Sequence, residues 1–297
     1  MTNQPGKQCT INSPAVVEGY GYWSGQDVRI EFHPASANDG ITFVRVDQAT
    51  PVRISATIDH LLETPRRTSL AHAGQRFEMR VEMIEHIMAA LAGLGIDNCE
   101  VRVDAVEMPG LDGSAQPFVE ALSEAGIVEL AAPRRRLVVD RVIRLGDDHR
   151  WIEARPAAGG SPLTIHYELD YGTDNAIGRQ TFEIELTPMS FRIELATSRT
   201  FMLRHEADGL LSQGLGTRVS PQDLLIFGDH GPIDNTLRFE NECVRHKVLD
   251  LVGDLMLSGC DIIGKISAYR AGHRMHAQLV QSLISNIQMN LPWKCSA

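Results

Sequence analysis

The sequence lacks the long apolar runs that mark membrane and secreted proteins. No stretch approaches the roughly 18 consecutive apolar residues of a membrane-spanning helix, and the polar residues 1–14 lack the apolar core of a signal peptide. Positive charge is also in short supply, because 28 Lys and Arg against 38 Asp and Glu give a net charge of −10. Binding to nucleic acid depends on clustered cations, so we expect neither a nucleic-acid partner nor a transmembrane segment.

Cysteine is scarce as well, with five residues in a chain of 297. These residues are widely spaced and form no Cys-x-x-Cys pair, which argues against a thiolate zinc site and against a disulfide framework. Such usage is typical of a reduced, cytoplasmic protein. Hydrophobic residues make up 43% and charged residues 22%, both near the globular average, and the length suggests two domains rather than one.

In the first half, alternating apolar residues predict strands and a change of period predicts helices. Strands are expected at residues 19–25, 28–32, 41–46, 52–58 and 99–103. Apolar residues recur at intervals of three and four over 81–94, which predicts an amphipathic helix that ends at Gly95. Ser114 is expected to cap a second helix that includes residues 118–127. The first half therefore consists of strands, a helix, a strand and a helix.

A run rich in Pro and Arg at residues 131–136 predicts a linker, so we divide the chain into domains 1–132 and 133–297. The second half repeats the scheme of the first. Strands are expected at residues 137–143, 151–154, 163–169, 180–186 and 262–268. Helices are expected over 244–257, ended by Gly259, and over 277–289.

The two halves can be overlaid with an offset of 164 residues. Gly95 then falls on Gly259 and Asp97 on Asp261, and the apolar positions of the two preceding helices coincide. This internal similarity predicts an α+β fold of two similar domains, each a mainly antiparallel sheet packed on helices.

The same overlay places polar residues at corresponding positions of two otherwise apolar helices. His86 falls on Asp250 and Glu82 on His246. His246 and Asp250 are four residues apart, so their side chains share one helix face and can chelate one metal ion. If the two helices pack together, His86 supplies a third ligand, and two His and one carboxylate leave a position open for water, as in catalytic zinc sites. The alternative is that His246 and Asp250 form an ordinary surface pair on the helix.

Further ionisable side chains accompany this set. Glu85 can serve as a general base beside a metal, Lys247 can neutralise an anion, and the alternative for each is a solvated helix residue. Asp254 extends the ionisable stripe of the second helix by one more turn. His273 follows a strand, in a loop where it can act as an acid or point to solvent.

Together these residues resemble the zinc-dependent UDP-3-O-acyl-N-acetylglucosamine deacetylase family over nearly the whole chain. The motifs that carry the resemblance occur in one order: Glu85-His86, Asp112-Gly-Ser-Ala115 with Pro117-Phe118, Ser198-Arg-Thr-Phe201, Arg245-His-Lys-Val-Leu-Asp250 with Gly253-Asp-Leu255, and Ala271-Gly-His273. The resemblance implies two similar α+β domains with the active site between them. It also implies a hydrolase that removes the N-acetyl group from UDP-3-O-acyl-N-acetylglucosamine in lipid A biosynthesis.

The resemblance assigns roles to individual residues, with Zn²⁺ as the cofactor and Fe²⁺ as the alternative. The zinc ligands are His86, His246 and Asp250. The acid–base groups are Glu85 as general base, His273 as general acid or electrostatic stabiliser, and Asp254 as the carboxylate that orients it. The substrate contacts are Thr200 at the oxyanion, Lys247, Phe201, and Arg270 near the nucleotide diphosphate. The expected partner is a UDP-linked acylated amino sugar, with transient contact to a membrane surface.

The chain departs from the family pattern at Trp23, where the family usually has His, at Asp174-Asn175, and in residues 214–220. The polar or charged groups of the last two segments, including Arg218, predict a shorter or different acyl group, because a charge disfavours a buried alkyl chain. A paralogue acting on a different amide is one alternative, and a catalytically silent binding or regulatory protein is another. Glu85 argues against the silent protein, since a binder needs no general base.

Overall fold

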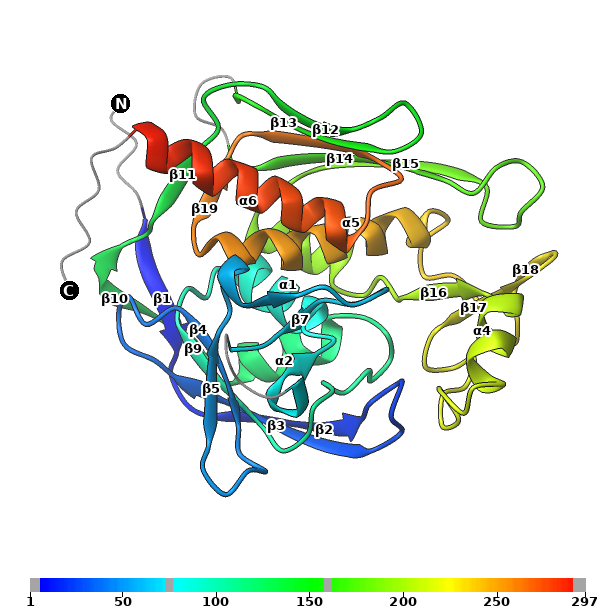
Figure 1. The fold of residues 1–297 in the computed structure, drawn as a ribbon, viewed down its shortest axis with the longest axis horizontal. Helices are drawn as coiled ribbons and strands as arrows, with labels where there is room; N and C mark the ends of the chain where they lie inside the picture. The colour runs from blue at the N-terminus through cyan, green and yellow to red at the C-terminus, as the bar shows by residue number, and fades with distance from the viewer. Residues whose placement is uncertain (1–5, 73–76, 158–161, 291–297) are drawn as a thin grey trace.

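Two five-stranded sheets form the outer layers of the molecule, and helices fill the space between them (Figure 1). The computed structural model describes residues 6–72, 77–157 and 162–290. One sheet comes from each half of the chain, and most of the strand pairs are antiparallel. The predicted α+β class, with two similar sheet-and-helix units, is confirmed.

The first sheet places its apolar side chains toward the helices. Its strands, in spatial order, are β2 (Ala15–Tyr20), β3 (Asp27–Pro34), β9 (Cys99–Val103), β4 (Ile41–Arg45) and β5 (Val52–Ser55). Along β3, Val28, Ile30 and Phe32 are buried while Arg29 and Glu31 face outward, as expected for a strand with one covered face. Only the β9–β4 pair of this sheet is parallel among the described strands.

The second sheet has the same arrangement. Its strands, in spatial order, are β12 (Ile143–Gly146), β13 (Trp151–Arg155), β20 (Lys265–Tyr269), β14 (Thr164–Asp170) and β15 (Arg179–Glu185). The pair β20–β14 is parallel and its other pairs are antiparallel, which matches the first sheet strand for strand. The internal similarity predicted from the 164-residue offset is therefore present in the topology.

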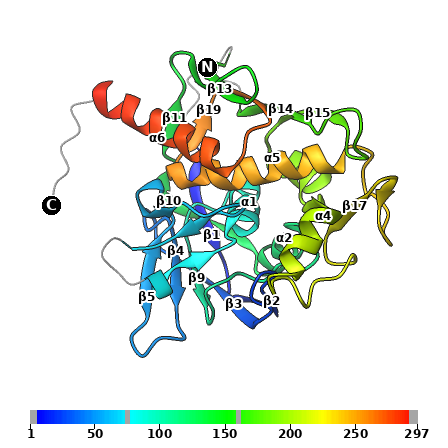
Figure 2. The same cartoon turned by 45° about the vertical axis from the view of Figure 1, so that its right-hand side comes forward.

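The helices form two inner layers that meet in the middle of the molecule (Figures 1 and 2). They are α1 (Glu85–Leu94) and α2 (Gln116–Glu124) on the first sheet, and α5 (Glu242–Leu255) and α6 (His273–Asn290) on the second. Helix α1 packs directly on α5, its counterpart in the overlay. Gly253 permits this contact, because a Cβ atom there would collide with the carbonyl oxygen of Glu85 and come within 3.1 Å of the Ala89 nitrogen.

Each half also carries a small insert before its central helix. The first insert contains β6 (Leu61–Leu62), β7 (Ser69–Leu70) and β8 (Val81–Glu82). The second contains α3 (Pro188–Ser190), β16 (Phe201–Leu203), α4 (Arg204–Leu211), β17 (Leu225–Gly228) and β18 (Gly231–Pro232). Both views show α4 and β17 to one side of the two sheets (Figures 1 and 2).

Several predicted boundaries are wrong, for local reasons. Helix α1 begins at Glu85 rather than at residue 81, because Met83 has a positive φ of 59° that no helix tolerates. Helix α2 is preceded by Ala115 rather than capped by Ser114, although the Ser114 hydroxyl accepts a hydrogen bond from the Gln116 backbone at 3.2 Å. Helix α6 begins at His273 rather than at residue 277, since the first turn has a single apolar residue, Met275, and carries no apolar period.

The segment predicted as a linker is partly a strand. Strand β10 (Ile127–Pro133) pairs with β1 (Lys7–Ile11), and β11 (Arg136–Val138) pairs in parallel with β19 (Asp261–Ile263). The chain therefore passes from one half to the other within about two residues, between β10 and β11. The exact boundary between residues 132 and 133 stays a prediction.

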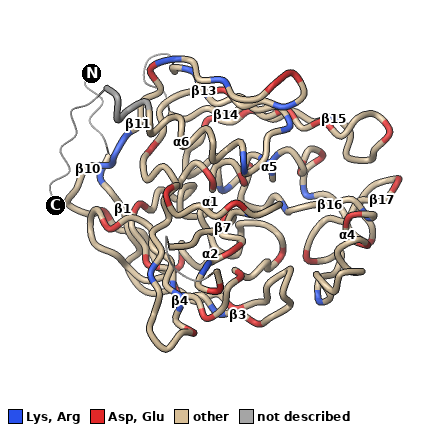
Figure 3. The backbone as a smooth tube through the Cα atoms, viewed as in Figure 1, with Lys and Arg blue, Asp and Glu red and all other residues tan. Residues whose placement is uncertain are grey.

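Figure 3 shows Lys and Arg interspersed with Asp and Glu along both halves of the chain.

Candidate metal centre and active site

Three side chains from the two central helices converge at one point. His86 lies at the second position of α1, and His246 and Asp250 are one turn apart on α5. The Asp250 Oδ1 atom is 3.7 Å from Nε2 of His86 and 3.3 Å from Nε2 of His246. One donor atom of each residue lies within 4.8 Å of the others, and all three residues are buried. The group can therefore hold one metal ion.

His246 is held in the tautomer that a metal ligand needs. Its Nδ1 atom lies 3.0 Å from the backbone carbonyl of Ser198, which can only accept, so Nδ1 carries the proton and Nε2 keeps its lone pair toward Asp250. Burial lowers the pKa of His246 to about 4, so the ring is neutral at pH 7. Two imidazoles and one carboxylate are a donor set that suits Zn²⁺ or Fe²⁺, and these residues fit such an ion.

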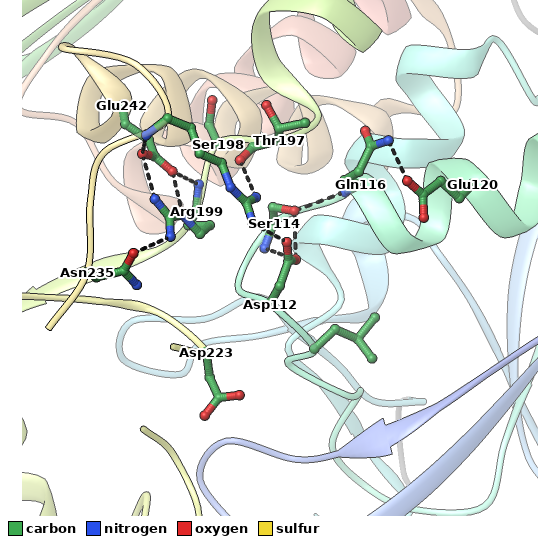
Figure 4. Close-up of polar contacts among 12 residues, drawn as sticks. Asp112, Ser114, Gln116, Glu120, Thr197, Ser198, Arg199, Asp223, Asn235 and Glu242 are labelled. Atoms are coloured by element: carbon green, nitrogen blue, oxygen red, sulfur yellow. Dashed lines mark hydrogen bonds and ion pairs between the residues drawn. The ribbon is translucent and has the colours of Figure 1, made fainter. Parts of the chain in front are cut away.

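The carbonyl that contacts His246 is fixed by a buried ion pair at the start of α5 (Figure 4). Glu242 is fully buried and accepts hydrogen bonds from the backbone N–H of Arg199 at 3.0 Å and from its Nε at 2.8 Å. The backbone N–H of Arg238 donates to the second carboxylate oxygen at 2.6 Å. These bonds hold the segment around Ser198 against the helix that carries His246, so the ring and its partner are positioned together.

Glu85 places a buried carboxylate beside the three-residue group. It opens α1, is 4% exposed, and accepts a hydrogen bond from the backbone N–H of Thr68 at 3.0 Å. Burial raises the pKa of Glu85, and the neighbouring His273 and His86 oppose that rise. A carboxylate with a raised pKa in a cavity wall has the properties of a general base.

His273 begins α6 and pairs with Asp254. The His273 Nδ1 atom is 2.7 Å from Asp254 Oδ2, while Nε2 is 4.0 Å from Oδ2 of Asp250. Burial lowers the pKa of His273, but the Asp254 carboxylate outweighs that effect and raises the pKa to about 9. The ring is thus a cation at neutral pH. The pKa of Asp254, which burial alone would raise, is held well below its usual range by His273.

Lys247 neutralises the outer oxygen of Asp250. Its Nζ atom is 2.6 Å from Oδ2, whereas Oδ1 of the same carboxylate faces the two imidazoles. Burial would raise the pKa of Asp250, yet His246 and Lys247 hold it well below its usual range. The carboxylate therefore stays ionised, with one oxygen in an ion pair and the other turned toward the candidate metal.

A cavity of about 1380 Å³ opens beside these groups. Most of the residues singled out in the sequence line it, and Asp254, only 2% exposed, lies behind His273. The lining residues among them are Glu85, His86, Thr200, Phe201, His246, Lys247, Asp250, Arg270 and His273. The Phe201 ring meets the His246 ring nearly at right angles, with 6.3 Å between centroids. One wall of the cavity is thus ionisable and another is aromatic.

The chain is similar over most of its length to proteins of one family. Residues 8–285 match the family model of LpxC, UDP-3-O-acyl N-acetylglycosamine deacetylase. A protein of Shewanella sp. (strain W3-18-1) named UDP-3-O-acyl-N-acetylglucosamine deacetylase is 35% identical over 280 residues, which are 94% of this chain and 90% of that protein. The protein of the same name from Anaeromyxobacter dehalogenans (strain 2CP-C) is 37% identical over 94% of this chain and 88% of its own length. The chain belongs to the UDP-3-O-acyl-N-acetylglucosamine deacetylase family.

Of the departures from the deacetylase family pattern, Trp23 lies on the cavity wall. Its loop is held by Glu107, which accepts hydrogen bonds from the backbone N–H groups of Trp23 at 2.7 Å and Ser24 at 2.8 Å. The guanidinium of Arg67, another lining residue, lies 4.8 Å from the centroid of the indole. The stacked pair gives the deacetylase cavity a large, cationic and aromatic wall at this position.

The other departures do not bring charge into the cavity as the sequence led us to expect. Arg218 donates to the Asp27 carboxylate at 2.7 Å and lies over the Tyr20 ring, while apolar Leu215 and Val219 of the same segment line the cavity. Asn175 accepts a hydrogen bond from a backbone N–H in its own loop. The expectation of a charged passage is therefore wrong for Arg218, and an altered acyl preference stays a prediction that rests on Trp23.

Thr68 is a site residue that the sequence analysis missed. Its backbone N–H donates to Glu85, and its hydroxyl donates to Asp254 Oδ1 at 2.5 Å. It lies just before the two-residue strand β7, where no periodicity exists to mark it.

Among the described residues of this deacetylase family member, no helix combines the length and apolarity needed to cross a bilayer.

Proposed function

We propose that this chain is a zinc-dependent amide hydrolase that removes the N-acetyl group from UDP-3-O-acyl-N-acetylglucosamine, a step of lipid A biosynthesis. The observation that carries the proposal is the convergence of His86, His246 and Asp250 within 4.8 Å, next to the buried carboxylate of Glu85. A general base beside three metal-ligand side chains serves hydrolysis and is not needed for binding alone. Membership of the deacetylase family supports the substrate class.

In this proposal His86, His246 and Asp250 hold the zinc ion, or Fe²⁺ in its place. The bound ion would supply Lewis-acid polarisation of the amide carbonyl and a more acidic water. Lys247 keeps Asp250 ionised through the 2.6 Å contact at Oδ2. The carbonyl of Ser198 keeps His246 in the required tautomer through the 3.0 Å contact at Nδ1.

We assign the base to Glu85 and the acid to His273, because each environment shifts the pKa of its group in the direction that its role requires. Glu85 accepts a proton from the attacking water, because it is a buried carboxylate in the cavity wall whose pKa is raised, chiefly by burial. His273, with a pKa of about 9, carries the proton that stabilises the developing negative charge and then reaches the leaving amine. Asp254 orients His273 through Nδ1, so that Nε2 is left for the substrate.

The remaining lining residues bind substrate in this proposal. The Thr200 hydroxyl and the Lys247 ammonium face the developing oxyanion, and Phe201 packs against the sugar or acyl group. Arg270, exposed at the cavity edge, contacts the nucleotide diphosphate. We place the reaction in the cytoplasm, with transient contact to a membrane surface through the acyl chain of the substrate.

The decisive experiment is a mass-spectrometric assay of the zinc-loaded protein with UDP-3-O-acyl-N-acetylglucosamine over a series of acyl lengths. We expect loss of the acetyl group, absent from the metal-stripped protein and restored when zinc is returned. A zinc-loaded protein that leaves every member of the series intact would overturn the substrate assignment. Hydrolysis of another N-acetyl sugar in its place would identify a paralogue with the same chemistry.

A further inference from the structure

His276 is a buried residue of the site region to which the mechanism above gives no role. It lies in the first turn of α6, three residues after His273, and none of its surface is exposed. Its Nδ1 atom is 2.7 Å from Asp254 Oδ2, the same oxygen that His273 Nδ1 contacts at 2.7 Å. The two imidazoles therefore share one carboxylate oxygen, and their ring centroids are 5.9 Å apart.

The contacts determine which nitrogen of His276 carries a proton. An ionised carboxylate only accepts, so Nδ1 of both His273 and His276 must be N–H donors. Burial lowers the pKa of His276, which favours the neutral ring with Nε2 as an acceptor. That atom is buried and has no hydrogen-bond partner among the described residues. A buried acceptor without a hydrogen-bond partner destabilises the folded protein, and an apolar side chain at position 276 would avoid that cost. The benefit that a histidine brings to this position is therefore the contact of its Nδ1–H with Asp254.

The Asp254 carboxylate needs to be held, because His273 has a second acceptor within reach. The Thr68 hydroxyl lies 3.1 Å from His273 Nδ1 and donates to Asp254 Oδ1 at 2.5 Å. If the carboxylate turned about its Cβ–Cγ bond, His273 Nδ1 would lose Oδ2 and could pair with Thr68. Thr68 on one oxygen and His276 on the other together prevent that rotation.

We propose that His276 is a positioning residue, whose Nδ1–H holds Asp254 so that His273 keeps one orientation and directs Nε2 into the cavity. The part of this role that concerns turnover rests on the proposed deacetylase function. The part that concerns the orientation of His273 does not, so the two parts are tested by different measurements.

The orientation is tested by NMR of the zinc-loaded protein labelled with ¹⁵N-histidine. In the unchanged protein we expect downfield Nδ1 protons from His273 and His276, in addition to that of His246, whose Nδ1–H contacts the Ser198 carbonyl. His276→Asn keeps an N–H donor near the Nδ1 position, so the His273 signal should remain while the His276 signal disappears. His276→Leu removes the donor, and the His273 signal should shift or broaden. An unchanged His273 signal in His276→Leu would overturn the proposal, whatever the substrate is.

Turnover is tested with the same variants and the substrate that the unchanged protein hydrolyses. We expect kcat of His276→Leu to fall roughly 10- to 100-fold with KM within about twofold, the usual scale for loss of a partner behind a reacting group. His276→Asn should recover kcat to within about threefold of the original value. Equal impairment of the Asn and Leu variants would overturn the proposal. If the unchanged protein hydrolyses no substrate, the proposed function fails and the NMR result still stands.

Two controls separate positioning from general damage. Leu279→Ala empties a fully buried apolar position about one turn further along the same helix, where the side chain donates no hydrogen bond to Asp254, so it should lower the melting temperature and leave kcat and the His273 signal unchanged. His276→Met supplies a flexible apolar side chain should His276→Leu fail to fold. In an Asp254→Asn background His276→Leu should cost nothing further, since its effect passes through that carboxylate. Full additivity of the two losses would overturn the proposal.

Discussion

Single residues in the candidate site owe their charge to contrasting environments. Glu85, Asp250 and Asp254 are all buried carboxylates, yet burial raises the pKa of the first while histidines and Lys247 outweigh burial and lower the pKa of the other two. The same chemical group, a buried carboxylate, therefore serves in our proposal as the base in Glu85, as a metal ligand in Asp250 and as the orienting group in Asp254.

The first prediction concerns the metal. His246→Ala removes one of three ligands, so zinc affinity should fall by on the order of 10²-fold or more. This loss should exceed the loss of zinc affinity caused by replacing a residue that does not bind the metal. Metal analysis after dialysis measures this, with the exposed His205→Ala on α4 as the matched control. Equal zinc content in the two variants would remove His246 from the ligand set.

The second prediction concerns the base. Glu85→Gln keeps the size of the side chain but cannot take a proton, so kcat should fall on the order of 10²-fold or more while zinc content stays unchanged. Steady-state kinetics and metal analysis of the same preparation give both numbers. Near-normal turnover of this variant would assign the base to another group.

The third prediction concerns pH. His273 must be protonated in the mechanism, so kcat/KM should be retained below its pKa of about 9 and lost as pH rises through that value. Asp254→Asn removes the carboxylate that raises this pKa, so the alkaline limb should move to lower pH. A pH–rate profile of both proteins measures the shift, and an unmoved alkaline limb in the variant would contradict the assignment.

At the scale of elements, the contact between α1 and α5 decides whether a site exists. The two helices bring His86 against His246 and Asp250, and at Gly253 the backbone of α1 lies so close that an added Cβ atom would collide with it. A side chain at Gly253 would meet the carbonyl of Glu85 and push the two helices apart. The glycine therefore determines both the spacing between the helices and the distances between the side chains of the site.

The fourth prediction follows from this contact. Gly253→Ala should destabilise the protein by about 1–3 kcal/mol or more through overpacking, and should weaken zinc binding because α1 is displaced. Gly209→Ala in α4 is the control, since nothing lies within 4 Å of its added Cβ and a helix favours Ala over Gly by up to about 1 kcal/mol. Thermal unfolding and zinc titration measure both. A Gly253→Ala protein as stable as the control would show that the helices can separate freely.

Elements with a clear period could be predicted from the sequence and short ones could not. The central strands and helices α1 and α5 carry several turns or pleats of apolar repeat, so periodicity predicts them. Strands β6, β7 and β8 have two residues each, too few for any period. The overlay indicated His86, His246 and Asp250, whereas Thr68 and His276 contact the site only through the tertiary fold, so no local pattern marks them.

At the scale of the whole molecule, the two halves share one apolar interior. A single cluster of buried side chains runs from the first sheet through both helix layers to the second sheet, with Phe32, Leu91, Leu251 and Ile266 among its members. The halves are similar in topology but are not separate bodies, because the α1–α5 contact lies inside that cluster.

The fifth prediction is that the protein unfolds in one cooperative transition. Separation of the halves would expose the apolar faces of α1 and α5, so neither half should persist when the other unfolds. Differential scanning calorimetry should give equal calorimetric and van't Hoff enthalpies. Two resolved transitions, with zinc lost in the first, would show instead that the halves are independently stable.

The packing of α1 on α5 also constrains how such a molecule could have arisen. A helix that packs on its own counterpart is the arrangement found at the interface of a two-fold symmetric homodimer. In such an ancestor every residue beside the axis occurs twice, so an ion on the axis receives its protein ligands in equal pairs. His86 and Asp250 occupy corresponding positions here yet differ, and the ligand set is odd in number. A set of two His and one carboxylate on such an axis thus needs two copies that mutate independently, as they can once both are joined in one chain.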